Sequence, residues 1–236
     1  MKKLLTVFTL MLFTSGLYAQ EAFEFGIKGG LNLSGYLAND DLALYQNNTS
    51  VRAGWNAGIY GKINVSENFS IQPEILYSLQ GVNFIDPEVY VDYVYVENFF
   101  APDYVAPVSG TYGDIVAKEN LHYLNVPIMA NFYLTDNFSF QIGPQFGFML
   151  NATARFDTED DEVNNVFNDF EESNEITGSY NGFSMAAAAG FQLELPSNVD
   201  LGLRYNFGLT DIVEDGNADE FQLTNQVGQV YVGYTF

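Results

Sequence analysis

The chain has no cysteine among its 236 residues, which excludes disulfides, thiolate metal sites and a lipid anchor on cysteine. It also has only 8 Lys and Arg against 30 Asp and Glu. This balance argues against a nucleic-acid partner, because phosphates attract a basic surface. No segment after the N-terminal region has eighteen consecutive apolar residues, so the sequence predicts no membrane-spanning helix.

The N-terminal region has the pattern of an export signal. Lys2 and Lys3 precede an apolar run over residues 4–13, and Ala19 ends a plausible cleavage site. The run is too short to span a membrane. We therefore predict a cleaved signal peptide over residues 1–19 and one domain over residues 20–236; the alternative is a buried N-terminal helix.

Aromatic residues and glycine are abundant, with 21 Phe, 16 Tyr and 21 Gly. Residues 199–209 alternate strictly between apolar and polar or glycine positions, which is the pattern of a strand with two different faces. Eleven tilted residues are also about the length of a transmembrane strand. Comparable segments lie at residues 23–34, 51–65, 69–84, 121–134, 138–151, 182–195 and 227–236, with a bulge suspected at 227–229.

The eight predicted strands are joined alternately by long loops and by short turns near residues 66–68, 135–137 and 196–198. A soluble barrel, apolar inside, is one alternative. However, an eight-stranded barrel has room inside only for its own side chains, and here the Gly, Ser, Asn and Gln faces fit a narrow interior better than the Phe, Leu and Ile faces. We therefore predict a closed eight-stranded antiparallel up-and-down transmembrane β-barrel with long extracellular loops and short periplasmic turns.

A few charged residues fall on the predicted inner face. They are Glu24, Lys28, Arg52, Lys62, Glu74, Glu194, Asp200 and Arg204. Lys28, Glu74 and Arg204 have similar heights along their strands, so we expect a central cluster with Glu74 between two cations, since a lone buried charge is costly. This cluster is interpreted either as a structural plug or as an ion gate in a small polar conduit.

Nothing in the sequence predicts an enzyme or a cofactor. The single histidine, His122, is expected near the loop end of its strand as a surface residue, and the chain has no nucleophile elbow, metal-binding His–Glu spacing or phosphate loop. The predicted long loops hold 22 of the 30 carboxylates. Asp157, Glu159, Asp160 and Asp161 are weak calcium candidates without EF-hand spacing, and a solvated acidic loop is the alternative. Divalent ions bridging these loops to lipopolysaccharide phosphates are a further hypothesis.

The loop over residues 85–117 differs from the others because it is strongly strand-forming and aromatic. It could form a protruding hairpin that docks a protein or glycan, or it could extend the two neighbouring strands above the membrane. The candidate contact residues are Tyr90, Tyr93, Tyr95, Phe99, Phe100 and Tyr104.

Four phrases resemble the PorT-like outer-membrane β-barrel family: residues 26–32 (GIKGGLN), 72–78 (QPEILYS), 123–127 (YLNVP) and 203–209 (LRYNFGL). Tyr234 and Phe236 resemble the C-terminal signal that such proteins present to the barrel assembly machinery. The resemblance covers nearly the whole mature chain and implies a porin-family barrel in the outer membrane of a Gram-negative-type bacterium.

From the sequence we expect a monomeric, non-catalytic protein with a structural or surface-interaction role in the envelope. Its expected partners are outer-membrane lipid, lipopolysaccharide, the assembly machinery and an unidentified surface or secretion partner. The alternatives are a narrow channel for small solutes and, from the resemblance alone, a component of protein export.

Overall fold

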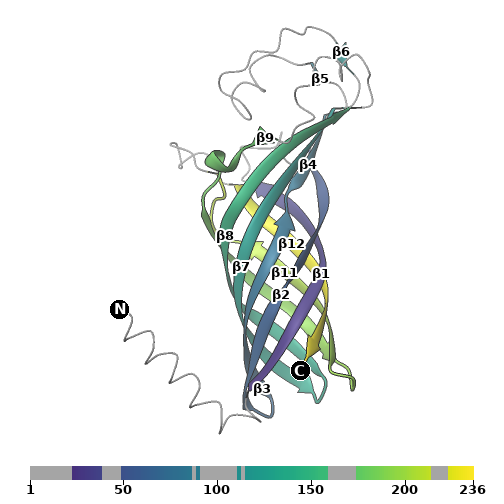
Figure 1. Ribbon diagram of the computed structural model, residues 1–236, viewed down its shortest axis with the longest axis vertical. Helices are drawn as coiled ribbons and strands as arrows, with labels where there is room; N and C mark the ends of the chain where they lie inside the picture. The colour runs from purple at the N-terminus through teal and green to yellow at the C-terminus, as the bar shows by residue number, and fades with distance from the viewer. Residues whose placement is uncertain are drawn as a thin grey trace, which may run out of the picture.

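The computed structural model describes residues 23–38, 49–86, 89–90, 111–112, 115–158, 174–213 and 223–236. These residues form a tall barrel with tilted strands, with the long connections at one end and the short turns and the C-terminus at the other (Figure 1). We call these the loop end and the turn end. Within the described ranges, no helix has the length and apolarity needed to cross a bilayer. The predicted signal peptide lies outside the described residues.

Eight strand paths build the wall. They are β1 (Phe23–Ala38), β2 (Thr49–Ser66), β3 (Phe69–Gln80) continued by β4 (Val82–Asp86), β7 (Ile115–Thr135), β8 (Phe138–Thr158), β10 (Phe183–Glu194), β11 (Val199–Gly208) and β12 (Leu223–Thr235). Each pairs antiparallel with the next, and β12 pairs with β1 from Gly26↔Thr235 to Ala38↔Leu223. The sheet therefore closes without an edge, and the predicted eight-stranded antiparallel barrel is confirmed.

Smaller elements lie at the loop end. The pair β5 (Val89–Tyr90) and β6 (Thr111–Tyr112) forms a separate two-stranded sheet, and β9 (Asn174–Glu175) adds to the side of β8. A short 3₁₀ turn, η3 (Thr177–Ser179), follows β9. β7 and β8 are 21 residues long, so they extend well beyond the predicted limits of residues 121 and 151.

Two predictions about strand continuity were wrong. The third strand path breaks at Gly81, whose φ of 135° lies in the region that favours glycine. The bulge suspected at 227–229 is absent, since the register of β12 with both β1 and β11 runs unbroken. The alternation only looked irregular because Val227 and Tyr231 are apolar in type and yet point into the barrel.

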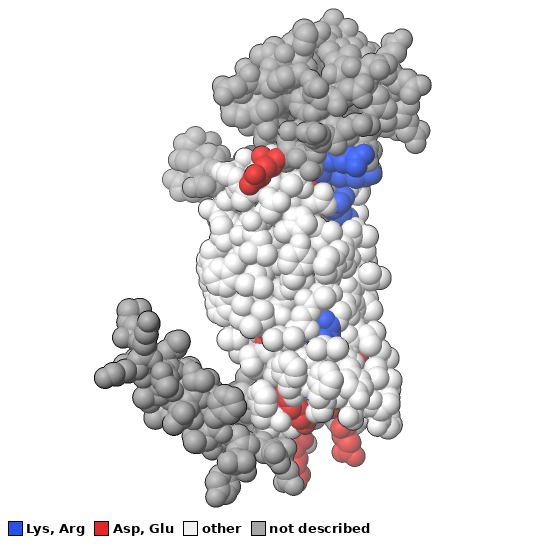
Figure 2. Space-filling model, in the orientation of Figure 1, with Lys and Arg blue, Asp and Glu red and all other residues white. Residues whose placement is uncertain are grey.

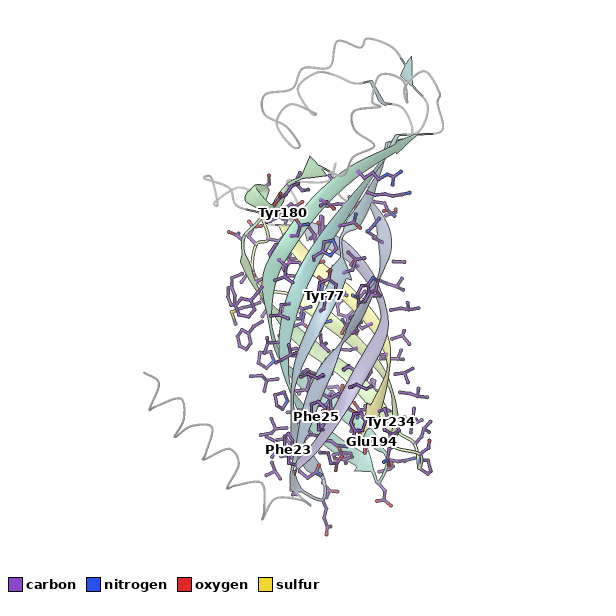
Figure 3. All side chains as sticks on the ribbon, in the orientation of Figure 1. Phe23, Phe25, Tyr77, Tyr180, Glu194 and Tyr234 are labelled. Atoms are coloured by element: carbon purple, nitrogen blue, oxygen red, sulfur yellow. The ribbon has the colours of Figure 1, made fainter. Side chains whose placement is uncertain are left out.

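The two faces of the wall differ as the alternation predicts. Leu31 is 66% exposed and Leu203 58%, whereas the adjacent Asn32 and Arg204 are at most 3% exposed. Side chains project outward along the whole height of the barrel (Figure 3), and the face seen in Figure 2 carries few charged residues between the two ends. Large apolar residues therefore face outward and polar residues fill the interior.

Two inward tyrosines each lie over a glycine of the neighbouring strand. Gly26 is the register partner of Tyr60, and Gly202 is the register partner of Tyr231. A Cβ added at Gly26 would lie 2.2 Å from the Tyr60 ring, and one at Gly202 would lie 2.1 Å from the Tyr231 ring. Only glycine leaves room for these rings, which explains part of the glycine content of the inner face.

Candidate functional site: the polar interior

The centre of the barrel holds an ion cluster built around Glu74 of β3. Arg204 of β11 donates two hydrogen bonds of 2.8 Å to the two Glu74 oxygens, and the Lys28 Nζ of β1 lies 3.1 Å from both. Gln72 donates a fifth bond to the same carboxylate. The side chains of all three charged residues are at most 2% exposed. The structure thus brings together Lys28, Glu74 and Arg204 from three separate strands.

A tyrosine that the sequence did not indicate completes this cluster. The Lys28 Nζ lies 3.6 Å from the centre of the Tyr231 ring, and the Arg204 guanidinium carbon lies 5.4 Å from it. The Tyr231 hydroxyl donates to Gln141, which also accepts a hydrogen bond from Arg204. Tyr231 therefore stabilises both cations through its ring and connects them to the next polar layer.

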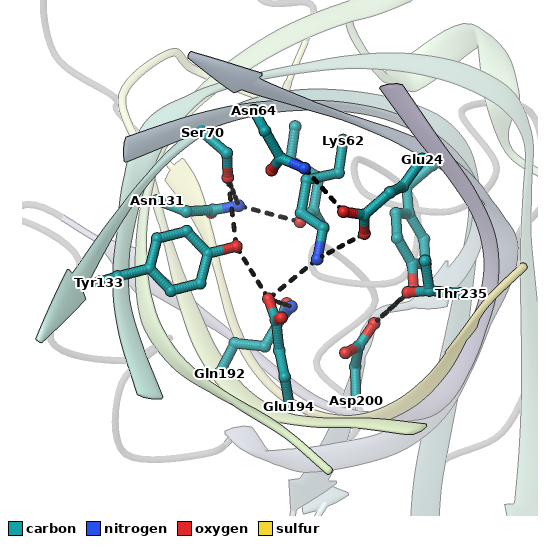
Figure 4. A network of polar contacts seen from close by, with 12 residues as sticks. Glu24, Lys62, Asn64, Ser70, Asn131, Tyr133, Gln192, Glu194, Asp200 and Thr235 are labelled. Carbon is teal, nitrogen blue, oxygen red and sulfur yellow. Dashed lines mark hydrogen bonds and ion pairs between the residues drawn. The ribbon is translucent and has the colours of Figure 1, made fainter. Parts of the chain in front are cut away.

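Below the central cluster, a continuous network leads to the turn end. Gln141 donates to Asn131 and Gln192, and Gln192 donates to Glu194. Lys62 lies between Glu24 at 2.9 Å and Glu194 at 3.0 Å (Figure 4). Further bonds in this region join Tyr133 to Glu194, Asn64 to Glu24, and Tyr60 and Thr235 to Asp200.

Directly above the central cluster lies a layer of neutral polar side chains. Asn32 donates to the Ser78 hydroxyl and to the carbonyls of Trp55 and Leu79, and it accepts from Asn56 and Gln229. Ser78 also accepts from Gln80, which accepts from Asn225. These side chains connect four strand paths, β1, β2, β3 and β12, without a formal charge.

A cavity lies higher still, lined by residues of β7, β8, β10, β11 and β12. Its volume, counted as the space that the centre of a water molecule can occupy, is about 20 Å³. Five buried amide atoms of its lining have no protein partner, on Asn125, Gln145, Asn206 and Asn225. A polar cavity of this size accommodates about one or two water molecules, which would satisfy these atoms.

An apolar cap closes the loop end over this cavity. Its members are Leu121, Tyr123, Ala152, Ala154, Ile176, Tyr180, Ile212 and Leu223. Tyr180 forms a bridge to Val213, and Asn181 donates to the carbonyls of Asp211 and Val213, so residues 176–181 and 209–213 are tied together. Sequence reasoning missed the cap because all of its members except Leu121 and Tyr123 lie outside the predicted strands.

Two further charged residues lie near the loop end. Arg52, which the sequence places on the inner face, donates to Asn83 and Asn120. Glu119 is 1% exposed and accepts a bond of 2.9 Å from Tyr36, although the predicted fourth strand began only at residue 121. The sequence missed Glu119 because β7 is longer than its clear alternation.

The other predicted site residues are only partly visible. Tyr90 belongs to β5, while Tyr93, Tyr95, Phe99, Phe100 and Tyr104 lie outside the described residues. Asp157 is the penultimate residue of β8. Glu159, Asp160 and Asp161 lie outside the described residues. Within the described part of the chain, no three His, Cys, Asp or Glu residues are grouped as metal ligands.

His122 bonds to the Tyr77 hydroxyl at 2.6 Å. Tyr234 and Phe236 are exposed at the turn end with ring centroids 5.3 Å apart.

Comparison with known structures finds small outer-membrane barrels. The chain is similar to Ail, the attachment invasion locus protein of Yersinia pestis, solved with the heparin analogue sucrose octasulfate, at 14% identity and a TM-score of 0.44, covering 91% of this chain and 99% of that one. It is also similar to Neisserial surface protein A, at 11% identity and a TM-score of 0.46, covering 90% of this chain and 97% of that one. A third similar structure is OprG of Pseudomonas aeruginosa, at 13% identity and a TM-score of 0.36, covering 91% of this chain and 96% of that one. No curated protein matches.

A family model gives the decisive relationship. The model described as the outer membrane protein beta-barrel domain matches residues 18–214, which is more than half of the chain. The closed barrel, the apolar outer wall and the polar interior are the properties that a membrane barrel needs. The chain belongs to the outer membrane protein beta-barrel domain family.

Proposed function

We propose that this protein is a non-catalytic barrel of the outer membrane whose lumen is sealed to solutes, with a structural or surface-interaction role in the envelope. The observation that carries the proposal is the buried Glu74 cluster, in which side chains from β1, β3, β11 and β12 meet across the lumen. The loop end then faces outside the cell and the turn end faces the periplasm.

The energetics of the cluster support a seal rather than a gate. Moving Glu74 away from Lys28 and Arg204 would leave buried cations without an anion, which costs about 3–5 kcal/mol for a broken buried pair. Gln72 would also lose its hydrogen-bond partner. A passage through the centre therefore requires several bonds to break together, and the apolar cap adds a second obstruction.

The test is solute flux through liposomes that contain the refolded protein. We expect the wild-type barrel to release neither small ions nor sugars above the level of empty liposomes. Glu74→Ala is the informative variant, and Glu67→Gln in the exposed β2–β3 turn is the matched control. Steady ion flux through liposomes that contain the wild-type barrel, above the flux through empty liposomes, would contradict the proposal that the lumen is sealed.

A narrow channel is the second candidate, and the polar cavity above the cluster is the observation that favours it. In that case, Glu74→Ala would connect this cavity to the lower network and raise ion flux well above that of the wild type. A wild-type barrel that already conducts, with a conductance that Glu74→Ala increases, would support the channel and contradict the seal.

The finer assignments belong to the same proposal. The PorT-like resemblance suggests a part in protein export, which a pull-down of secretion components with the membrane-embedded protein would test. We also propose that residues 1–19 are cleaved, that the barrel is monomeric, and that Tyr234 and Phe236 contact the assembly machinery. N-terminal sequencing of the membrane-inserted protein checks the cleavage site.

A further inference from the structure

A second buried carboxyl group lies near the loop end, apart from the central cluster. Glu119 of β7 is 1% exposed, and its inner-face neighbours Leu121 of β7 and Ala154 of β8 are at most 2% exposed. Lys118 and Asn120, which precede and follow Glu119, are polar and only partly buried. This part of β7 therefore lies beyond the apolar wall, and the protein itself, not the lipid, buries the carboxyl group.

Only one of the two Glu119 oxygens has a hydrogen-bond partner. The Tyr36 hydroxyl of β1 donates to Oε2 at 2.9 Å, whereas Oε1 is buried without a partner among the described residues. The Oδ1 atom of Asn225 on β12 is likewise buried and unpaired, and Asn225 is the register partner of Tyr36. Both unpaired oxygens are acceptors when Glu119 is ionised. A proton on Oε1 supplies this layer with a donor.

The charges around Glu119 do not offset its burial. Arg52 of β2 provides a nearby positive charge, and its guanidinium donates hydrogen bonds to two asparagines. Burial raises the pKa of the Glu119 carboxyl from its ordinary value to about 8, although the Tyr36 hydrogen bond and the Arg52 charge act in the opposite direction. The carboxyl therefore holds a proton at neutral pH. The neighbouring inner-face residues of the other strands are uncharged; they are Tyr36, Val82, Tyr123, Ala154 and Asn225.

The same carboxyl group lies against the apolar cap. Leu121 and Tyr123, two and four residues after Glu119 on the inner face of β7, are cap members, and Tyr36 packs against the cap. Tyr180, labelled at the loop end in Figure 3, is another member. An ionised carboxylate at this position needs water, because a buried charge with too few donors is costly. Movement of the cap admits that water.

We propose that Glu119 is a pH sensor of the loop end: protonated Glu119 keeps the apolar cap closed, and loss of its proton opens the cap to the surrounding water. Opening exposes the polar cavity below the cap, whose lining includes Tyr123 and Asn225. The Glu74 cluster lies deeper and keeps its own partners, so opening the cap requires no ion flow across the membrane. The proposal therefore stands whether or not the lumen conducts.

The direction of the pH effect follows from proton linkage. The pKa of Glu119 is about 8 in the closed structure and returns toward its ordinary value of 4.5 when the open loop end is hydrated. Between these two values, opening releases one proton, so its equilibrium constant rises about tenfold for each pH unit. The closed cap is therefore most favoured at acidic pH, and this advantage is lost as the pH rises through the pKa of the closed form.

The experiment measures how fast a charged, membrane-impermeant methanethiosulfonate reagent labels a cysteine in the cap. The chain has no cysteine, and Ala152→Cys places one at a cap position that is 0% exposed. Ser179→Cys, at an exposed position of η3, corrects for the pH dependence of the thiol reaction itself. In refolded protein in lipid vesicles, the ratio of the two labelling rates should rise at least tenfold between about pH 6 and about pH 8.

Three further substitutions, each combined with both cysteine variants, test the role of the proton. Glu119→Gln keeps the shape of the protonated carboxyl group without a proton to lose, so its labelling ratio should stay low and change less than twofold. Tyr36→Phe keeps the ring and removes the donor to Oε2, so the rise should continue to a higher pH before it levels off. Glu175→Gln, at an exposed loop-end carboxylate, is the matched control and should behave like the wild type.

The proposal is overturned if the wild-type ratio does not rise, if Glu119→Gln rises as the wild type does, or if Tyr36→Phe levels off at the wild-type pH. Heat-modifiable gel migration of each variant checks that the barrel has folded.

Discussion

The two halves of the barrel interior satisfy their buried polar groups in different ways. In the turn-end half, charged residues are held by partners on several strands, and Glu74 alone accepts five hydrogen bonds. In the loop-end half, neutral amides predominate, a small cavity remains, and amide atoms on four residues lack protein partners. The lower half therefore specifies one arrangement, whereas the upper half allows water to complete its hydrogen bonding.

The largest expected effect concerns the central cluster. Glu74→Ala leaves Lys28 and Arg204 buried without their anion, so we expect it to lower the free energy of unfolding by about 3–5 kcal/mol. Urea unfolding of the refolded barrel in lipid vesicles measures the change. The triple variant Lys28→Met, Glu74→Leu, Arg204→Met removes the charges together and should recover much of the loss. Equal instability of both variants would contradict this account.

The next effect tests how tightly the lower half is packed. Gly26→Ala forces a methyl group into the Tyr60 ring and should cost about 1–3 kcal/mol of unfolding free energy, the usual range for overpacking. Gly35 of the same strand, toward the loop end, has no atom within 4 Å of an added Cβ. Gly35→Ala on the outward face of the same strand is therefore the control and should be neutral. Similar losses at both positions would mean that contact with the Tyr60 ring is not the cause of the loss.

Two amides provide a direct comparison of hydrogen bonding. The Gln141 side chain makes four hydrogen bonds, so Gln141→Met should cost about 1–3 kcal/mol of unfolding free energy by leaving its partners unsatisfied. Both amide atoms of Asn206 lack protein partners, so Asn206→Leu should change the unfolding free energy by less than about 1 kcal/mol. Urea unfolding in lipid vesicles measures both changes. A larger loss for Asn206→Leu than for Gln141→Met would contradict the difference in hydrogen bonding between the two halves.

The smallest effect lies at the turn-end mouth, where the Lys62 partners are partly exposed. Glu24 and Glu194 side chains are 35% and 25% exposed, so water can hydrate them after Lys62→Gln. We expect a loss of about 1 kcal/mol, reduced further in 1 M salt, because exposed charges are screened. Salt should leave the Glu74→Ala effect almost unchanged. If 1 M salt reduced the effects of Lys62→Gln and Glu74→Ala equally, the two ion clusters would be equally accessible to solvent, which would contradict the difference in burial.

Much of the fold followed from alternation alone, because a strand in a closed membrane barrel must separate lipid-facing from inward residues. Counting positions from the turns also gave the common height of Lys28, Glu74 and Arg204, which the structure brings into contact. Tyr231 was overlooked because its side chain can suit either face. Glu119 and the cap lie where strands extend above the membrane, and there tertiary packing decides which residues are buried.

The Tyr60 ring also has a consequence for how the sheet closes. It lies over Gly26 of β1, and its hydroxyl bonds to Thr235 of β12 and Asp200 of β11, so a single side chain spans the junction between the first and last strands. The backbone ladder between β1 and β12 is therefore not the only connection across the line where the sheet closes. A side chain of β2 joins the two sides of that line from inside the barrel, where lipid cannot compete for its hydrogen bonds.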